Sequence, residues 1–279
     1  MTITAENRIY RVADTHAHIY KAKIAAKASK ATGTFYDWMM YSDDATAEGL
    51  LRIEGEGVGV DRFLVCSVAT TTPQVSSINN FIAAECAAHP QFTGMGAAYP
   101  GVEDFGALIE EVQQLGLAGI KLHPDIQRYN IDDPTMMELY QRAADAGLIM
   151  MFHVGDERYD YSAPERLARV LDRVPNLRVH AAHFGCCRIW KRRPLVLAEY
   201  AQGGADIAFD TCSMLEWSSV SETRELIDAL GLERIMWATD FPMWDPYVEL
   251  QHIFELGFSP DETQAILYDN FARFYRIEE

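Results

Sequence analysis

The sequence predicts an α/β protein folded as a single (β/α)8 TIM barrel over residues 1–279, and three observations support this. The chain has 279 residues, close to the ~250 that such a barrel needs. Eight short, apolar and β-branched runs alternate with longer segments whose apolar residues recur three and four positions apart. Residues suited to binding and proton transfer gather at the ends of these runs. Barrels assemble their sites at the carboxyl ends of the strands, so this placement favours a closed barrel.

Each of the eight runs has the length and composition of a strand in a parallel sheet. The predicted strands are Arg11–His16, Arg62–Val68, Gly94–Tyr99, Ala118–His123, Leu148–His153, Leu177–His183, Ala205–Thr211 and Ile235–Asp240. Parallel neighbours need crossover connections, which the amphipathic segments between the runs supply. The alternative, an open doubly wound sheet, would carry GxGxxG after its first strand, where this chain has His-Ala-His.

The segments between the strands carry helix start and stop signals. Asp104–Leu115 forms one apolar stripe and stops at Gly116, and a helix that opens at Pro134 stops at Gly147. Ser162–Glu165 has the spacing of a capping box before the next helix.

Two segments depart from a minimal barrel. Ile19–Asp44 is rich in lysine, alanine and aromatic residues, among them Tyr36, and we interpret it as an extended, partly helical loop over the barrel mouth. After the last strand, Tyr247–Leu256 and Asp261–Tyr275 are predicted to be helices.

Composition limits the partners and the location of the protein. A formal net charge of −17 repels phosphate backbones and anionic lipid surfaces, so neither nucleic acid nor a membrane is expected. A bound divalent cation would still allow an anionic small-molecule substrate. The N-terminus has no apolar secretory segment, and no run approaches the ~18 apolar residues of a membrane span. Five cysteines without a CxxC pair fit a reducing compartment, and we therefore expect a cytoplasmic protein.

Potential metal ligands and proton carriers lie late in the predicted strands or just after them. They are His16 and His18, Lys121 and His123, His153, His183, Asp210, and Asp240. His16 and His18 share one face of their strand, so both can point into the barrel. Imidazole and carboxylate groups suit Zn²⁺ and similar ions, and three or four of them leave a position open for water. Asp210 is a candidate for orienting a histidine ligand.

The sixth strand offers two histidines in HAAHFG, at positions 180 and 183. In a regular strand these two side chains face opposite sides, so only one of them can line the site. We assign His183, nearer the mouth, to the site and His180 to a packing or supporting role.

Five motifs together resemble a known family. DTHAHIY, GIKLHP, MFHVG, HAAHFG and WATDFP, in this order and spacing, resemble the amidohydrolase superfamily. Within it they are similar to the amidohydrolase-related group of aminocarboxymuconate semialdehyde decarboxylase and several small hydrolases and lactonases. The resemblance runs from Asp14 to the closing Asn270–Tyr275 helix, and it is specific for the superfamily but not for a reaction.

The resemblance implies one divalent metal ion, Zn²⁺ or alternatively Mn²⁺ or another ion. Its implied ligands are His16, His18, His153 and Asp240. Asp240 would also relay a proton from water, and His183 would polarise the substrate or handle protons. Two-metal relatives carry a carbamylated lysine on the fourth strand, so a second ion bridged by Lys121 remains an alternative.

Four further residues are expected to bind the substrate. Lys121 and His123 offer positive or hydrogen-bonding groups, and Arg188 could clamp a carboxylate in bidentate fashion. Trp244 lies in a loop at the same face and is a candidate pocket wall.

The predicted function is hydrolysis of a small ester, lactone or amide by metal-activated water. Non-oxidative decarboxylation of a small carboxylic acid by the same ligands is the alternative. A barrel that binds a metal or ligand without turnover is less favoured, because buried polar groups without partners cost about 1–3 kcal/mol each. The resemblance also makes a homo-oligomer an expectation.

Overall fold

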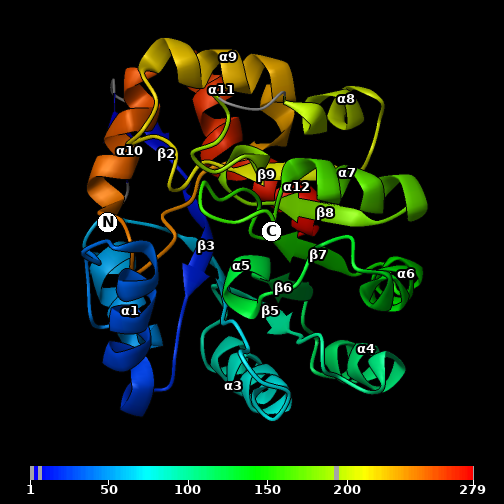
Figure 1. Cartoon of the computed structure of the whole chain (residues 1–279). Helices are drawn as coiled ribbons and strands as arrows, with labels where there is room; N and C mark the ends of the chain where they lie inside the picture. Colours follow the sequence, from blue (N-terminus) through cyan, green and yellow to red (C-terminus); the bar gives the residue numbers. More distant parts are fainter. Residues whose placement is uncertain (1–2, 6–7, 192–194, 279) are drawn as a thin grey trace.

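The computed structural model describes residues 3–5, 8–191 and 195–278, which form a nearly closed barrel of eight parallel strands with helices around it (Figure 1). The barrel strands are β3 (Ala13–His18), β4 (Arg62–Cys66), β5 (Phe92–Ala97), β6 (Gly119–Leu122), β7 (Ile149–Phe152), β8 (Arg178–Ala181), β9 (Ile207–Asp210) and β10 (Ile235–Met236). They neighbour one another in chain order. The predicted barrel is confirmed, and every predicted strand overlaps an observed one.

The first and last strands meet through backbone contacts. The Thr15 N–H donates to the Trp237 carbonyl at 3.1 Å, and the His18 N–H donates to the Phe241 carbonyl at 2.8 Å. Ala17 and Phe241 also form a parallel bridge. Thr15 and Trp237 lie 222 positions apart in the sequence, so this closure joins chain segments that no local pattern connects.

Helices connect the strands and follow the last one. They are α1 (Ala22–Tyr36), α2 (Ala47–Leu50), α3 (Gln74–Ala88), α4 (Phe105–Gln114), α5 (Pro124–Gln127), α6 (Met137–Asp145), α7 (Pro164–Arg173), α8 (Val196–Gln202), α9 (Val220–Leu230), α10 (Pro246–Glu255), α11 (Pro260–Gln264) and α12 (Asn270–Tyr275). Short strands β1 (Ile3–Ala5) and β2 (Arg8–Tyr10) form a separate antiparallel pair. Among the described residues, no helix combines the length and apolarity needed to cross a bilayer.

The helix ends follow the sequence signals with one exception. Asp104 accepts the Ala107 N–H at 2.9 Å and so caps α4, and Gly116 follows this helix with a φ of 66°. The predicted capping box before α7 is wrong. Pro164 takes the first helical position, where its missing N–H costs nothing, and the N-cap residue is therefore Ala163, which has no capping side chain.

The end of the barrel opposite the polar side chains is filled by apolar ones. Met95, Met151 and Met236 from the strands pack there against Phe271 and Tyr275 of α12. The C-terminal helix therefore closes this end of the barrel, and the ligand-sized cavity lies at the carboxyl ends of the strands.

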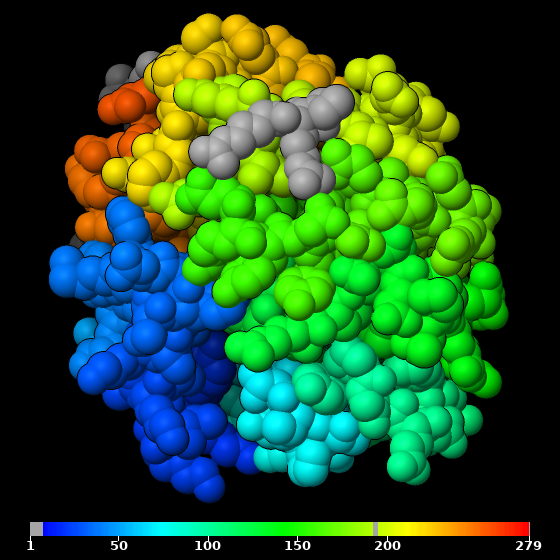
Figure 2. Space-filling model, viewed as in Figure 1, coloured from blue at the N-terminus to red at the C-terminus, as the bar shows by residue number. Residues whose placement is uncertain are grey.

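Helix α1 covers part of the open end. It occupies most of the segment that the sequence predicts as an extended loop, and its alanine-rich sequence favours a helix over a loop. In Figure 2 the surface is hollowed between the blue residues of α1 and the cyan residues of α3. Lys21, at the start of α1, and Gln74 and Ser77 of α3 line the cavity below this opening.

Candidate active site

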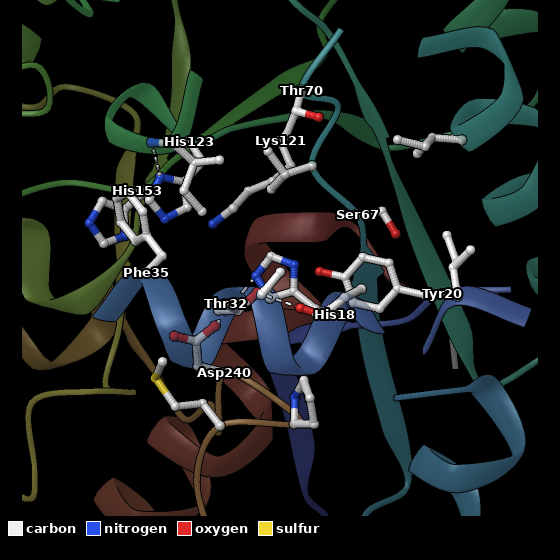
Figure 3. A pocket seen from close by; sticks show the side chains of 18 of the residues that line it. His18, Tyr20, Thr32, Phe35, Ser67, Thr70, Lys121, His123, His153 and Asp240 are labelled. Atoms are coloured by element: carbon white, nitrogen blue, oxygen red, sulfur yellow. Dashed lines mark hydrogen bonds and ion pairs between the residues drawn. The ribbon is translucent and has the colours of Figure 1, made fainter. Parts of the chain in front are cut away.

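A cavity of about 540 Å³ lies at the carboxyl ends of the strands. Its polar wall comes from the barrel and comprises His16, His18, Lys121, His123, His153, His183 and Asp240. The opposite wall comes mainly from α1 and nearby loops, with Ile24, Phe35, Tyr36 and Met243 among its apolar and aromatic members. Figure 3 shows Lys121, His18 and Asp240 arranged around one open space, with His123 and His153 side by side at its edge.

His16, His18 and Asp240 converge within the cavity. The Nε2 atoms of His16 and His18 are 3.2 Å apart. Asp240 Oδ1 lies 3.6 Å from His16 Nε2 and 3.4 Å from His18 Nε2. Donor atoms bound tetrahedrally at ~2.1 Å would be ~3.4 Å apart. The three donors therefore fit a single divalent cation in both type and spacing.

A buried carboxylate orients the His16 ring. Asp210 Oδ2 accepts from His16 Nδ1 at 2.9 Å and from His180 Nε2 at 3.0 Å, while Oδ1 accepts the His183 backbone N–H at 2.7 Å. Burial opposes ionisation, but the His16 and His180 rings outweigh it and hold the pKa of Asp210 well below its usual range. Because Nδ1 of His16 donates to Asp210, Nε2 presents its lone pair to the cavity. This is the supporting arrangement expected for Asp210 from the sequence.

A second buried carboxylate ties the two ligand-bearing segments together. Asp14 accepts the backbone N–H groups of His16 at 3.0 Å and Thr239 at 3.1 Å. The Thr239 hydroxyl lies 2.8 Å from Asp14 and 2.9 Å from Glu54. Burial, followed by the charge of Asp14, raises the pKa of Glu54 well above its usual range. Sequence reasoning missed Glu54, since no motif marks it.

The strand-parity argument for His180 and His183 is wrong, although both assignments agree with the structure: His183 lines the cavity, and His180 supports Asp210 below it. β8 ends at Ala181, and His180 pairs in register with Met151 and Ala208, whose side chains fill the barrel interior. His180 thus points inward below the site and contacts Tyr275 at 2.8 Å. His183 reaches the cavity because the backbone leaves the strand and adopts a φ of 60° at this residue.

His153 and His183 form a pair beside the three convergent donors. His153 Nδ1 lies 2.9 Å from His183 Nε2, and His153 Nε2 lies 2.8 Å from the Gly155 carbonyl. Because a carbonyl only accepts, Nε2 of His153 carries a proton and Nδ1 holds the lone pair. The structure therefore brings His153 to the cavity wall, with its lone pair facing His183. Its role as a fourth ligand remains a prediction.

Lys121 is a fully buried cation at the base of the cavity. Its Nζ lies 2.8 Å from His16 Nε2 and donates a hydrogen bond to the lone pair of this nitrogen, which faces His18 and Asp240. Burial and then the charge of Lys121 lower the pKa of His16 to about 3. Burial alone would lower the pKa of His18, but Cys66 and Asp240 raise it to about 9.

Asp240 stays ionised within this group. Burial disfavours its charge, but His16 and His18 outweigh this effect and hold the pKa of Asp240 well below its usual range. Asp240 has a φ of 55°, which is uncommon for a residue other than glycine, and the backbone turns at this position after β10. The carboxylate is therefore ionised at neutral pH and available to bind a cation.

His123 is engaged at both ring nitrogens. Its Nδ1 accepts the Ile126 N–H at 3.3 Å, and its Nε2 lies 2.6 Å from the Tyr36 hydroxyl. Its ring stacks on that of His153 at a centroid distance of 4.1 Å. Tyr36 thus belongs to the site, whereas the sequence places it only among the aromatic residues of a long loop.

Arg188 and Trp244 line a smaller neighbouring cavity of about 40 Å³, which His153, His183 and Asp240 also line. The Arg188 guanidinium lies 3.9 Å from the centre of the Trp217 ring. The Trp244 indole donates to Ser213, whose hydroxyl donates to Asp240. The structure therefore places both residues near Asp240, outside the main cavity.

A family model described as amidohydrolase matches residues 13–277. The chain belongs to the amidohydrolase family. This membership confirms the resemblance seen in the motifs and identifies the chain as an enzyme. Among curated proteins, the uncharacterized protein y4mH of Sinorhizobium fredii (strain NBRC 101917 / NGR234) is 30% identical over 99 residues. That match covers 32% of this amidohydrolase and 33% of y4mH, so it spans about a third of the relative's length.

Solved structures share the barrel fold at low sequence identity. The 5-carboxyvanillate decarboxylase LigW of Sphingomonas paucimobilis is 20% identical, with a TM-score of 0.72 over 96% of this chain and 100% of that one. A dihydroxybenzoic acid decarboxylase of Polaromonas sp. JS666, solved with bound manganese, is 11% identical, with a TM-score of 0.73 over 97% and 98%. An uncharacterized TIM-barrel protein of Bordetella bronchiseptica is 18% identical, with a TM-score of 0.76 over 95% and 98%.

Proposed function

We propose that this amidohydrolase is a metal-dependent lyase that removes the carboxylate of a small aromatic acid without oxidation. The observation that carries the proposal is the buried Lys121 cation beside three donors that fit a divalent cation. Two kinds of positive charge at the base of one cavity favour an anionic substrate group. The apolar and aromatic wall from α1 suits a flat ring. Similarity to several decarboxylases, one of them solved with manganese, gives further support.

His16, His18 and Asp240 would hold the ion once the His16 Nε2 lone pair is released from Lys121. His153 would join them through its Nδ1 lone pair. A divalent ion bound there would supply Lewis acidity towards an oxygen of the substrate. Mn²⁺ and Zn²⁺ both accept this nitrogen and oxygen donor set. We assign a single ion to the site, because Lys121 lies against His16 as a cation that would pair with the substrate carboxylate.

The reaction breaks the bond between the ring carbon and the carboxylate carbon. The carboxylate departs as carbon dioxide, its bonding electron pair stays on the ring carbon, and a proton then adds there. The protein therefore has to hold a proton beside that carbon and to exclude bulk water. Asp240 and His183 line the cavity and are the groups that we assign to the transfer of this proton.

Hydrolysis of an ester, lactone or amide is the second candidate. It is favoured by the amidohydrolase family itself. The two reactions need the same ligands and differ in their products.

Product chemistry distinguishes the two candidates. We would incubate the Mn²⁺-loaded and Zn²⁺-loaded protein with a panel of hydroxybenzoates and a panel of aryl lactones and esters. Carbon dioxide release from the acids supports the lyase, and a new carboxylate from the lactones or esters supports the hydrolase. Asp240→Asn should abolish either activity, whereas Asp43→Asn, which changes an exposed side chain, should retain it. A lactone or ester activity without carbon dioxide release would overturn the lyase proposal.

A further inference from the structure

The hydrogen bonds around His123 fix the direction of a short proton chain. The Ile126 backbone N–H can only donate, so the nitrogen that it faces, His123 Nδ1, must hold a lone pair. A neutral imidazole with a bare Nδ1 carries its proton on Nε2. That proton points to the Tyr36 hydroxyl oxygen, 2.6 Å away. Tyr36 is therefore the acceptor in this pair, and its own O–H is left to donate elsewhere.

The free end of this chain opens on the cavity. Tyr36 lines both the main cavity and the smaller one beside Asp240. Within the described residues, His123 is the hydrogen-bond partner of the Tyr36 hydroxyl, and no protein acceptor receives its proton. A part-buried hydroxyl that lines a cavity and has an unused donor can be paired by an acceptor atom of a ligand there.

The position of Tyr36 is fixed from the other side by Arg158. This guanidinium lies 4.6 Å from the centre of the Phe35 ring and 5.1 Å from that of Tyr36, and it donates to the Phe35 carbonyl. Asp156 holds the same guanidinium through a 2.7 Å contact. The carboxyl end of α1 is thus clamped to the loop after β7, and the hydroxyl does not have to be ordered when a ligand binds.

We propose that Tyr36 donates a hydrogen bond to an oxygen of the bound substrate, and that His123 and the Ile126 backbone fix it as a donor. Tyr36 thereby selects substrates that present an acceptor atom, such as a phenolate or carboxylate oxygen, at this edge of the cavity. His123 acts as a positioning residue: it donates to the Tyr36 hydroxyl oxygen and so leaves the Tyr36 O–H free to donate to a ligand. The donor role of Tyr36 follows from the hydrogen bonds of His123 alone, whereas the contact with an aromatic acid rests on the proposed function.

The polarity is tested first, without any ligand. The protein would be labelled with ¹⁵N-histidine, and the ring resonances of His123 would be assigned by their loss in His123→Asn. We expect a protonated Nε2 and a bare Nδ1, both in the unchanged protein and in Tyr36→Phe, because Ile126 sets this tautomer. A proton on Nδ1 would mean that Tyr36 donates to His123, and it would overturn the proposal.

The contact is tested with 2,6-dihydroxybenzoate as the probe, on the Mn²⁺-loaded protein, by calorimetry. A hydrogen bond to a charged oxygen is worth about 1.5–3 kcal/mol, so Tyr36→Phe should bind the probe about 10- to 100-fold more weakly. Tyr159→Phe is the matched control. It removes the hydroxyl group from the exposed ring that stacks on Phe35 at 6.0 Å, and it should bind as the unchanged protein does.

Two failures remain distinguishable. Equal affinity in Tyr36→Phe and the unchanged protein would overturn the substrate contact, and a melting temperature measured on both would confirm that the variant is folded. If the unchanged protein does not bind 2,6-dihydroxybenzoate at all, the proposed substrate class is refuted. The tautomer of His123 then still decides the polarity of Tyr36.

Discussion

Replacing Asp210 by asparagine should weaken the binding of a divalent ion that Asp210 never touches. The Asp210 carboxylate accepts from two histidine rings and from the His183 backbone N–H, and it holds His16 with its Nε2 lone pair towards the cavity. An asparagine side chain keeps one acceptor oxygen and replaces the other by an amide group that can only donate. The position of one of the two carboxylate oxygens can then no longer accept the hydrogen bonds made there, and the His16 ring can turn or change tautomer.

The structure allows the size of this effect to be worked out. Each hydrogen bond to the charged carboxylate contributes about 1.5–3 kcal/mol, and the loss of one divides between stability and metal affinity. Removal of such an outer carboxylate from a histidine ligand lowers metal affinity about 10- to 100-fold, which is about 1.4–2.7 kcal/mol. We therefore expect a Kd for Mn²⁺ or Zn²⁺ that is at least ~10-fold higher in Asp210→Asn, with a lower melting temperature.

A competition titration against a chromophoric chelator measures this Kd. Asp206→Asn is the matched control. Asp206 immediately precedes β9, and within the described residues its one ion pair is with the partly exposed Arg178, at 2.9 Å. Its metal affinity should not change. A folded Asp210→Asn protein with a Kd within twofold of the original would refute the idea that Asp210 orients His16 for a cation.

Three further predictions follow from other parts of the structure. His183→Asn should lower kcat by about 10²- to 10⁴-fold on the substrate identified by the product assay, with unchanged metal affinity, and a kcat within tenfold would end its catalytic role. Glu54 has a raised pKa, so the folded protein retains a proton that the unfolded chain releases above about pH 4.5. Stability should then fall with rising pH by up to ~1.4 kcal/mol per unit until the raised pKa is passed. Urea unfolding at pH 5 and pH 8 should show a smaller loss in Glu54→Gln, and parallel losses in both proteins would contradict the protonated state. Gly119→Ala would place a Cβ 1.9 Å from the Ile149 carbonyl oxygen. We therefore expect the free energy of unfolding, measured by thermal unfolding, to fall by about 3 kcal/mol or more. Gly55→Ala, whose nearest neighbour would lie at 3.8 Å, is its control, and equal melting temperatures would argue against the tight β6–β7 contact.

The smaller cavity beside Asp240 shows which features of the site a local sequence pattern can predict and which it cannot. The sequence places Arg188 and Trp244 near the open end of the barrel, and the structure agrees. Their separation from Lys121, which lines only the larger cavity, depends on side-chain packing between Trp38, Trp217 and Trp244. Packing of this kind between distant loops has no periodic signature in the sequence.

The sequence by itself determined the eight strand–helix units and the placement of His16, His18 and Asp240 at strand ends. Both depend on short-range periodicity and on the rule that parallel strands present their carboxyl ends to one edge. Only the tertiary structure decided which way the sixth-strand histidines face, because β8 stops at Ala181 and the backbone turns at His183. It also decided the pairing of Tyr36 with His123, 87 positions apart. Such contacts form only when the barrel closes and α1 settles over its mouth, and nothing within one turn of helix or one strand encodes them.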